Sequence, residues 1–109
     1  MTTFELLVWS ECPSAEEAHT RLAALLRELG RADVGIAVRW IETEEDAATV
    51  HFVGSPTYWW QGRELLPPGE SAPVGLSCRV YRRRDGRPSP LPDPADLRDA
   101  VVTALSAES

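Results

Sequence analysis

The stretch FELLVWSECPSAEEA, residues 4–18, contains the junction that decides the fold. Its first six residues are apolar or aromatic with one exception and end at a polar break, which is typical of a buried β-strand. Pro13 suits the first position of a helix, where its missing N–H is tolerated. Ser14 and Glu17 have the spacing of a capping box, although Cys12 could equally hold the N-cap position. Alanines and leucines then recur at three- and four-residue steps up to Gly30, as in an amphipathic helix with a glycine cap. We therefore expect a strand followed directly by a helix, with Cys12 at the start of that helix.

The rest of the chain continues this alternation of strands and helices. We expect a second strand over residues 36–41, a short helix capped by Thr43, a third strand over 57–60, a loop over 66–75, a fourth strand over 76–82, a loop over 88–94, and a last helix that starts at Asp93 and Pro94. The order β-α-β-α-β-β-α implies parallel strands joined by right-handed crossovers, with the final two strands antiparallel. We predict a single α/β domain over residues 1–109, in which helices flank a four-stranded mixed sheet.

Composition narrows the classes of partner. The formal net charge is -6, from 17 acidic and 11 basic residues, which argues against a nucleic-acid or anionic membrane partner. Every basic residue is arginine, a bias typical of GC-rich bacteria, and the run over residues 82–84 is interpreted as a solvated turn rather than an anion-binding patch. Neither a signal peptide nor a membrane span is expected, so we predict a cytoplasmic protein with free or catalytic cysteines.

Three features together resemble the thioredoxin and glutaredoxin family over nearly the whole chain. They are the segment WSECP (residues 9–13) between strand and helix, the segment GSPT (residues 54–57) before the third strand, and a C-terminal helix after two antiparallel strands. The resemblance implies a thioredoxin-like fold, a nucleophilic Cys12 and a cis bond between Ser55 and Pro56. It also implies that the N–H and C=O before the proline pair with an extended peptide or thiol substrate. The substrate-binding residues would be Trp9, Pro13, Ser55, Pro56 and Thr57.

Elementary electrostatics supports Cys12 independently of this resemblance. The unpaired N–H groups and partial positive charge of a helix N-terminus stabilise a thiolate, which is the reactive form of cysteine. The neighbouring carboxylate of Glu11 opposes this effect. The alternative is that Cys12 packs at the edge of the core and is inert.

The chain departs from the family at the position where a second cysteine is expected. Thioredoxins have C-x-x-C, whereas here the segment is CPSA, and Ala15 cannot attack a mixed disulfide. The Gly-Phe-Ser that follows the cysteine of monothiol glutaredoxins is also missing. The ordinary dithiol mechanism is therefore excluded for this motif, and whether the chain is an enzyme stays open.

The remaining thiol, Cys78, lies in the segment GLSCRVY (residues 75–81). This segment and residues 54–57 resemble bacterial thioredoxin-like proteins, some of them loosely labelled alkylmercury lyases, although that label does not justify transferring the activity. If the fourth strand returns from a tight hairpin, Cys78 starts about 15 Å from Cys12. We therefore favour a packing role for Cys78 in a strand. The alternative is a resolving thiol, which the long connection over residues 61–77 brings back towards Cys12.

Two functional hypotheses follow. The first is thiol–disulfide exchange centred on Cys12 and resolved by Cys78 or an external thiol, with a thiol- or disulfide-bearing protein or small molecule as partner. The second is a binding module without redox turnover, which holds a soft metal ion through Cys12 and Cys78 or a protein in the groove beside Pro56. No cofactor is predicted, because the sequence has neither zinc-ligand spacing nor a nucleotide motif. His19 and His51 are expected to be surface or structural residues.

Overall fold

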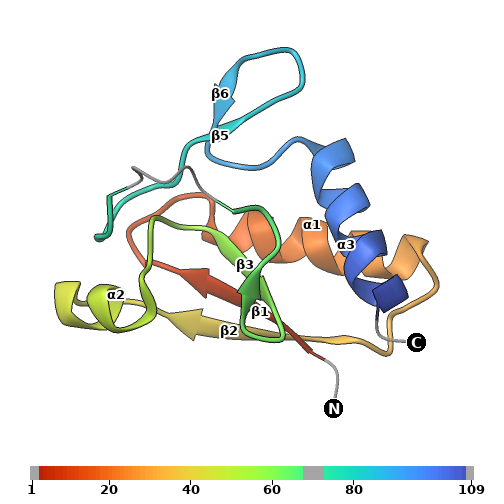
Figure 1. Cartoon of the computed structure of the whole chain (residues 1–109), viewed down its shortest axis with the longest axis horizontal. Helices are drawn as coiled ribbons and strands as arrows, with labels where there is room; N and C mark the ends of the chain where they lie inside the picture. The colour runs from red at the N-terminus through yellow and green to blue at the C-terminus, as the bar shows by residue number, and fades with distance from the viewer. Residues whose placement is uncertain (1–2, 68–72, 108–109) are drawn as a thin grey trace.

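A computed structural model describes residues 3–67 and 73–107 of the chain (Figure 1). Its elements are β1 (Thr3–Val8), α1 (Ala15–Glu28), β2 (Gly35–Trp40), α2 (Glu44–Val50), β3 (Thr57–Trp60), β4 (Arg63–Glu64), β5 (Tyr81–Arg82), β6 (Pro88–Ser89) and α3 (Pro94–Ala107). The main sheet has the strand order β2-β1-β3-β4, while β5 and β6 form a separate ribbon. Strand β1 is parallel to β2 and antiparallel to β3, and β3 is antiparallel to β4. The expected α/β class and four-stranded mixed sheet are confirmed.

The fourth strand of the sheet is not the one predicted. Gln61 and Gly62 both have positive φ, 52° and 79°, as in the two-residue turn whose twist suits a hairpin. The chain therefore reverses at once, and Arg63 pairs with Trp60 to form β4. The predicted strand over residues 76–82 is reduced to β5, which pairs with β6 inside the predicted loop over residues 88–94. Part of the other predicted loop, residues 68–72, lies outside the described residues.

The first helix begins later than predicted. Cys12 N–H donates to the Trp9 carbonyl at 2.9 Å, so the residues before the helix form a turn. Helix α1 then starts at Ala15, and its N-cap Ser14 makes no side-chain capping bond. Of the two cap positions considered, the cap is at Ser14 and not at Cys12, which lies two positions before it. Pro13 is not the first helical residue. At the other end, Gly30 has a φ of 71° and terminates the helix, as predicted.

The caps of the other two helices agree with the sequence. Thr43 Oγ1 accepts a hydrogen bond from Asp46 N–H at 3.0 Å at the start of α2. Asp93 Oδ1 accepts one from Ala95 N–H at 2.9 Å at the start of α3. Both side chains satisfy N–H groups that have no partner within their own helix.

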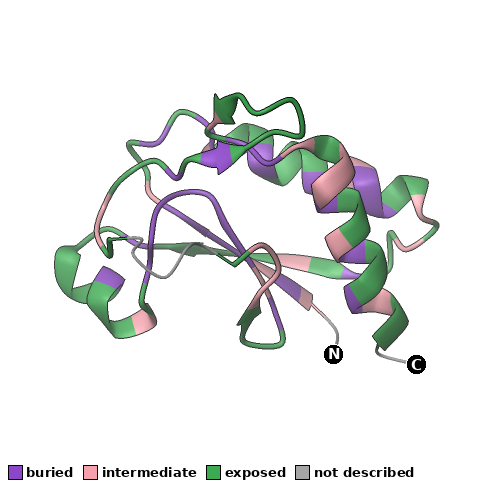
Figure 2. Cartoon of the chain, turned by 45° about the horizontal axis from the view of Figure 1, so that its top comes forward, coloured by how far each residue is buried: buried purple, intermediate pink, exposed green. Residues whose placement is uncertain are grey.

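Two apolar clusters cover the two faces of the main sheet. Figure 2 marks the buried residues of the chain in purple. Leu6 and residues of α1 and α3 belong to the larger cluster, while Leu7 and Ala47 of α2 belong to the smaller one. Trp60 belongs to the larger cluster and Trp59 packs against the smaller one, because neighbouring side chains of a strand point to opposite faces of the sheet. Helices therefore contact both faces of the sheet. Within the described residues no helix is long and apolar enough to cross a membrane.

Candidate functional site

The two cysteines meet at one end of the molecule. The Sγ atoms of Cys12 and Cys78 are 3.4 Å apart, with Cys78 as the hydrogen-bond donor. Both are free thiols; Cys12 is only 4% exposed, whereas Cys78 is exposed. The favoured interpretation of Cys78 as a packing residue in a strand is therefore wrong, because its side chain faces solvent and the other sulfur. A resolving role for Cys78 stays a prediction.

Backbone pairing explains how Cys78 reaches this place. Ser55 N–H donates to the Ser77 carbonyl, and Arg79 N–H donates to the Ser55 carbonyl, both at 2.8 Å. These two bonds form an isolated parallel bridge between Ser55 and Cys78. After the β3–β4 hairpin, the long connection thus returns to the segment before β3. The estimate of 15 Å failed because it assumed that the chain went directly from the hairpin into a fourth strand.

The bond between Ser55 and Pro56 is cis, as the resemblance implied. Thr57 Oγ1 donates to the Gly54 carbonyl, and the Tyr81 hydroxyl donates to the Pro56 carbonyl, both at 2.6 Å. The N–H and C=O of Ser55, which the resemblance assigned to an extended substrate, are paired with residues 77 and 79 of the same chain. The chain itself therefore occupies the position beside the proline turn.

Buried polar contacts fix the surroundings of Cys12. The Cys12 thiol donates to the Ser55 carbonyl at 3.4 Å, and Ser55 is fully buried. Ser55 Oγ in turn accepts a hydrogen bond from Trp9 N–H at 3.1 Å. The side chain of Trp9 packs against the smaller apolar cluster, while Pro13 is exposed. The buried backbone of Ser55 thus helps to hold the sulfur of Cys12 in place.

The thiol–thiol contact changes the pKa of Cys78. Its S–H hydrogen bond to Cys12 raises the pKa of Cys78 above its usual range, with smaller contributions from desolvation and from the charge on Cys12. A thiol with a raised pKa keeps its proton to higher pH. Cys78 therefore gives up its proton less readily than an isolated cysteine.

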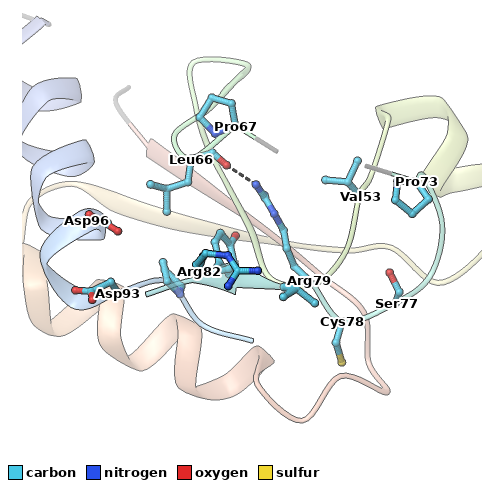
Figure 3. Close-up of a pocket in the computed structure, with 13 residues that line it drawn as sticks. Val53, Leu66, Pro67, Pro73, Ser77, Cys78, Arg79, Arg82, Asp93 and Asp96 are labelled. Carbon is cyan, nitrogen blue, oxygen red and sulfur yellow. Dashed lines mark hydrogen bonds between the residues drawn. The ribbon is translucent and has the colours of Figure 1, made fainter. Parts of the chain in front are cut away.

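Arg79 is a site residue that the sequence did not reveal (Figure 3). Its side chain is 6% exposed, and one guanidinium nitrogen lies 2.7 Å from Glu64 Oε1. Another nitrogen donates to the Leu66 carbonyl, and the guanidinium carbon is 4.6 Å from the centroid of the Tyr81 ring. Arg79 thus joins the segment that carries Cys78 to the β3–β4 hairpin. Nothing in the local pattern SCRVY distinguishes this arginine from an exposed one.

Arginines in the run over residues 82–84 form ion pairs and hydrogen bonds with other residues of the chain. Arg84 forms ion pairs at 2.7 Å with Asp96 and with Asp99 of α3. Arg82 donates to the Gly86 carbonyl at 2.6 Å. All three arginines are exposed, which agrees with the predicted solvated turn.

Other groups considered as ligands lie elsewhere. His19 and His51 are exposed, on α1 and at the end of α2. Among residues 3–67 and 73–107 there is no group of three or more histidine, cysteine, aspartate or glutamate side chains placed to hold a metal ion. A metal bound at the thiol pair would therefore find no third histidine, cysteine, aspartate or glutamate ligand in that part of the chain.

The fold and the site define an α/β protein with two convergent thiols beside a cis-proline turn. Comparison of the chain with family models, with curated proteins and with solved structures found no match. The chemistry must therefore be inferred from the site itself.

One prediction concerns the hydrogen bond that supports the proline turn. Replacing Tyr81 with phenylalanine removes the donor to the buried Pro56 carbonyl. We expect the free energy of unfolding to fall by about 1–2 kcal/mol, because a buried acceptor loses its partner. Urea denaturation of the reduced protein measures this change. Tyr58→Phe is the matched control, since Tyr58 is also a buried tyrosine but no hydrogen bond joins its hydroxyl to the described residues; equal losses in the two variants would contradict the prediction.

Proposed function

We propose that this protein carries out thiol–disulfide exchange, with Cys12 and Cys78 cycling between a dithiol and a disulfide. The supporting observation is the 3.4 Å separation of their sulfurs, which is about 1.4 Å longer than a disulfide bond. In the reductive direction an external disulfide takes up two electrons and is released as two thiols. The pair gives up those electrons together with two protons and becomes a disulfide.

We further propose that the fold is a thioredoxin-like one with a relocated second thiol. The order of β1, α1 and β2, the cis-proline turn before an antiparallel β3, and the C-terminal helix α3 support this assignment. Helix α1 carries Ala15 where the second cysteine of thioredoxins stands. Cys78 supplies a sulfur instead from the segment that pairs with Ser55. Holding two reacting groups in contact makes their reaction effectively unimolecular, which favours fast resolution of a mixed disulfide.

A non-redox binding role has less support. A partner in the groove beside Pro56 would need the free N–H and C=O of Ser55. Residues 77 and 79 of the chain already pair with these two groups. A soft metal ion would find only two thiolates among the described residues. Exchange chemistry requires no further group from the protein.

A thiol count under mild oxidation tests the proposed function. We expect the reduced protein to lose both thiols together, without forming dimers, and to lose a mass equal to two hydrogens. Cys12→Ser and Cys78→Ser should each keep one thiol under the same conditions. Mass spectrometry of the intact chain, before and after reduction, measures this. Oxidation that yields only intermolecular dimers, or leaves both thiols free, would show that the pair does not form a disulfide.

A further inference from the structure

We infer that an external substrate joins the protein at Cys78 and that the buried Cys12 is the resolving thiol. The inference rests on the proposed function and concerns the order in which the two sulfurs act. It is the reverse of the order that the family resemblance implies for Cys12.

The first observation is the difference in access. Cys12 is 4% exposed and its sulfur contacts both the Ser55 carbonyl and the sulfur of Cys78. Cys78 is exposed, and so are Ser77 and Val80 close to it, Val80 to 71%. Exchange needs three sulfurs, so an external disulfide must bring two of them up to the attacking thiolate. Cys78 has space for that approach, whereas Cys12 does not.

The second observation is that the chain fills the route to Cys12 beside the proline turn. Residues 77 and 79 hold the N–H and C=O of Ser55, and Cys78 stands between them against the sulfur of Cys12. A molecule that approaches along this segment therefore meets Cys78 before it meets Cys12. Figure 3 shows Cys78 on the segment between Ser77 and Arg79.

The exchange then proceeds in two balanced steps. Cys78 loses its proton to solvent, and its thiolate attacks one sulfur of the external disulfide, so that one thiolate leaves and a mixed disulfide forms on Cys78. Cys12 next loses its proton to solvent, and its thiolate attacks the sulfur of Cys78, which expels the second external thiolate and forms the Cys12–Cys78 disulfide. In the reverse direction an external thiolate attacks the exposed sulfur of Cys78, and the Cys12 thiolate leaves.

The contact between the thiols also predicts a pH dependence. Because its hydrogen bond to Cys12 raises the pKa of Cys78, the thiolate of Cys78 in the reduced protein should appear at a higher pH than in an isolated cysteine. Replacing Cys12 with alanine removes that hydrogen bond. The rate of alkylation of Cys78 should therefore rise at lower pH in Cys12→Ala than in the wild type, and a profile that does not move would contradict the role of this contact.

Reaction of the reduced protein with Ellman's reagent, a small aromatic disulfide, tests the inference. Cys12→Ser should release one aryl thiolate per chain and retain the other as a stable adduct on Cys78. Cys78→Ser, whose remaining thiol is buried, should react about ten-fold or more slowly than Cys12→Ser. The wild type should release two aryl thiolates and keep no adduct. In denaturant the two variants should react at equal rates, so that the difference is assigned to the fold.

The possible results separate the two claims. If Cys78→Ser reacts as fast as Cys12→Ser or faster, the order of the sulfurs is overturned, while two released thiolates from the wild type still support the pair. If the wild type ends in a stable adduct, the proposed function fails as well. Should a variant not fold, acid quenching of the wild type at early times followed by peptide mapping gives the same answer. The transient adduct should be on Cys78, and an adduct on Cys12 overturns the inference.

Discussion

Replacing Arg79 with methionine is expected to lower the free energy of unfolding by about 3 kcal/mol. The methionine keeps the apolar stem but removes the positive charge next to Glu64, whose side chain is 20% exposed. Removing one partner of a largely buried ion pair leaves the charge of Glu64 uncompensated in a site that is mostly shielded from water. The Leu66 carbonyl and the ring of Tyr81 lose their contacts at the same time.

Chemical denaturation under reducing conditions measures this loss. Arg39→Met is the matched control, because Arg39 faces Glu5 at 3.9 Å with side chains that are 49% and 36% exposed, and such solvent-exposed pairs contribute less than about 1 kcal/mol. Adding Glu64→Leu to Arg79→Met should recover part of the loss, since no unpaired charge remains. A loss in Arg79→Met no larger than in Arg39→Met would show that the buried pair is not important for stability.

The second large effect is expected for Gly54→Ala. A Cβ at this position would lie 2.8 Å from Arg79 Cα and 2.9 Å from Arg79 N, and the φ of 132° is one that side-chain-bearing residues rarely adopt. Backbone must therefore move. We expect a loss of about 3 kcal/mol or more in the free energy of unfolding, from backbone strain and overpacking together.

This substitution should also separate the thiols. The segment that must move carries Cys78 and pairs with Ser55, so formation of the internal disulfide should slow by about ten-fold or more, since its rate depends on holding the sulfurs in contact. Gly62→Ala is the control, because Gly62 has a φ of 79° but nothing within 4 Å of the added Cβ. Gly62→Ala should lower the free energy of unfolding only through its unfavourable backbone conformation, and it should leave the rate of thiol oxidation unchanged. Equal effects of the two alanines would contradict the close approach of residue 79.

Local patterns in the sequence predicted much of the sheet and two of the helix caps. The bounds of β3 follow from four strong strand formers between a proline turn and a glycine. Thr43 and Asp93 were identifiable because cap residues act on their own helix, within three positions. The start of α1 was placed too early, because a turn over residues 9–15 competes with the helix for the same backbone groups.

The site was predictable only to the extent that it is local. Cys12 and the cis-proline turn are recognisable from short motifs, and the structure confirms the cis bond. The position of Cys78 depends on the path of the chain after Gly62, where the tight hairpin forms β4 and leaves residues 77–79 free to pair with Ser55. Arg79 depends on the same path, because its partner Glu64 lies on that hairpin. The residue spacing within the β3–β4 hairpin or within residues 77–79 does not indicate that these two segments are in contact.

The distance along the chain between the two thiols links folding to oxidation. Cys12 and Cys78 are 66 positions apart, and a disulfide that closes so long a loop would restrict the unfolded chain enough to stabilise the fold by roughly 4 kcal/mol. By thermodynamic linkage, the folded protein must favour its disulfide over that of the unfolded chain by the same free energy. If the proposed disulfide forms, the melting temperature of the protein would therefore depend on the redox potential of the surrounding medium. The oxidised protein would then have a higher melting temperature than the reduced protein.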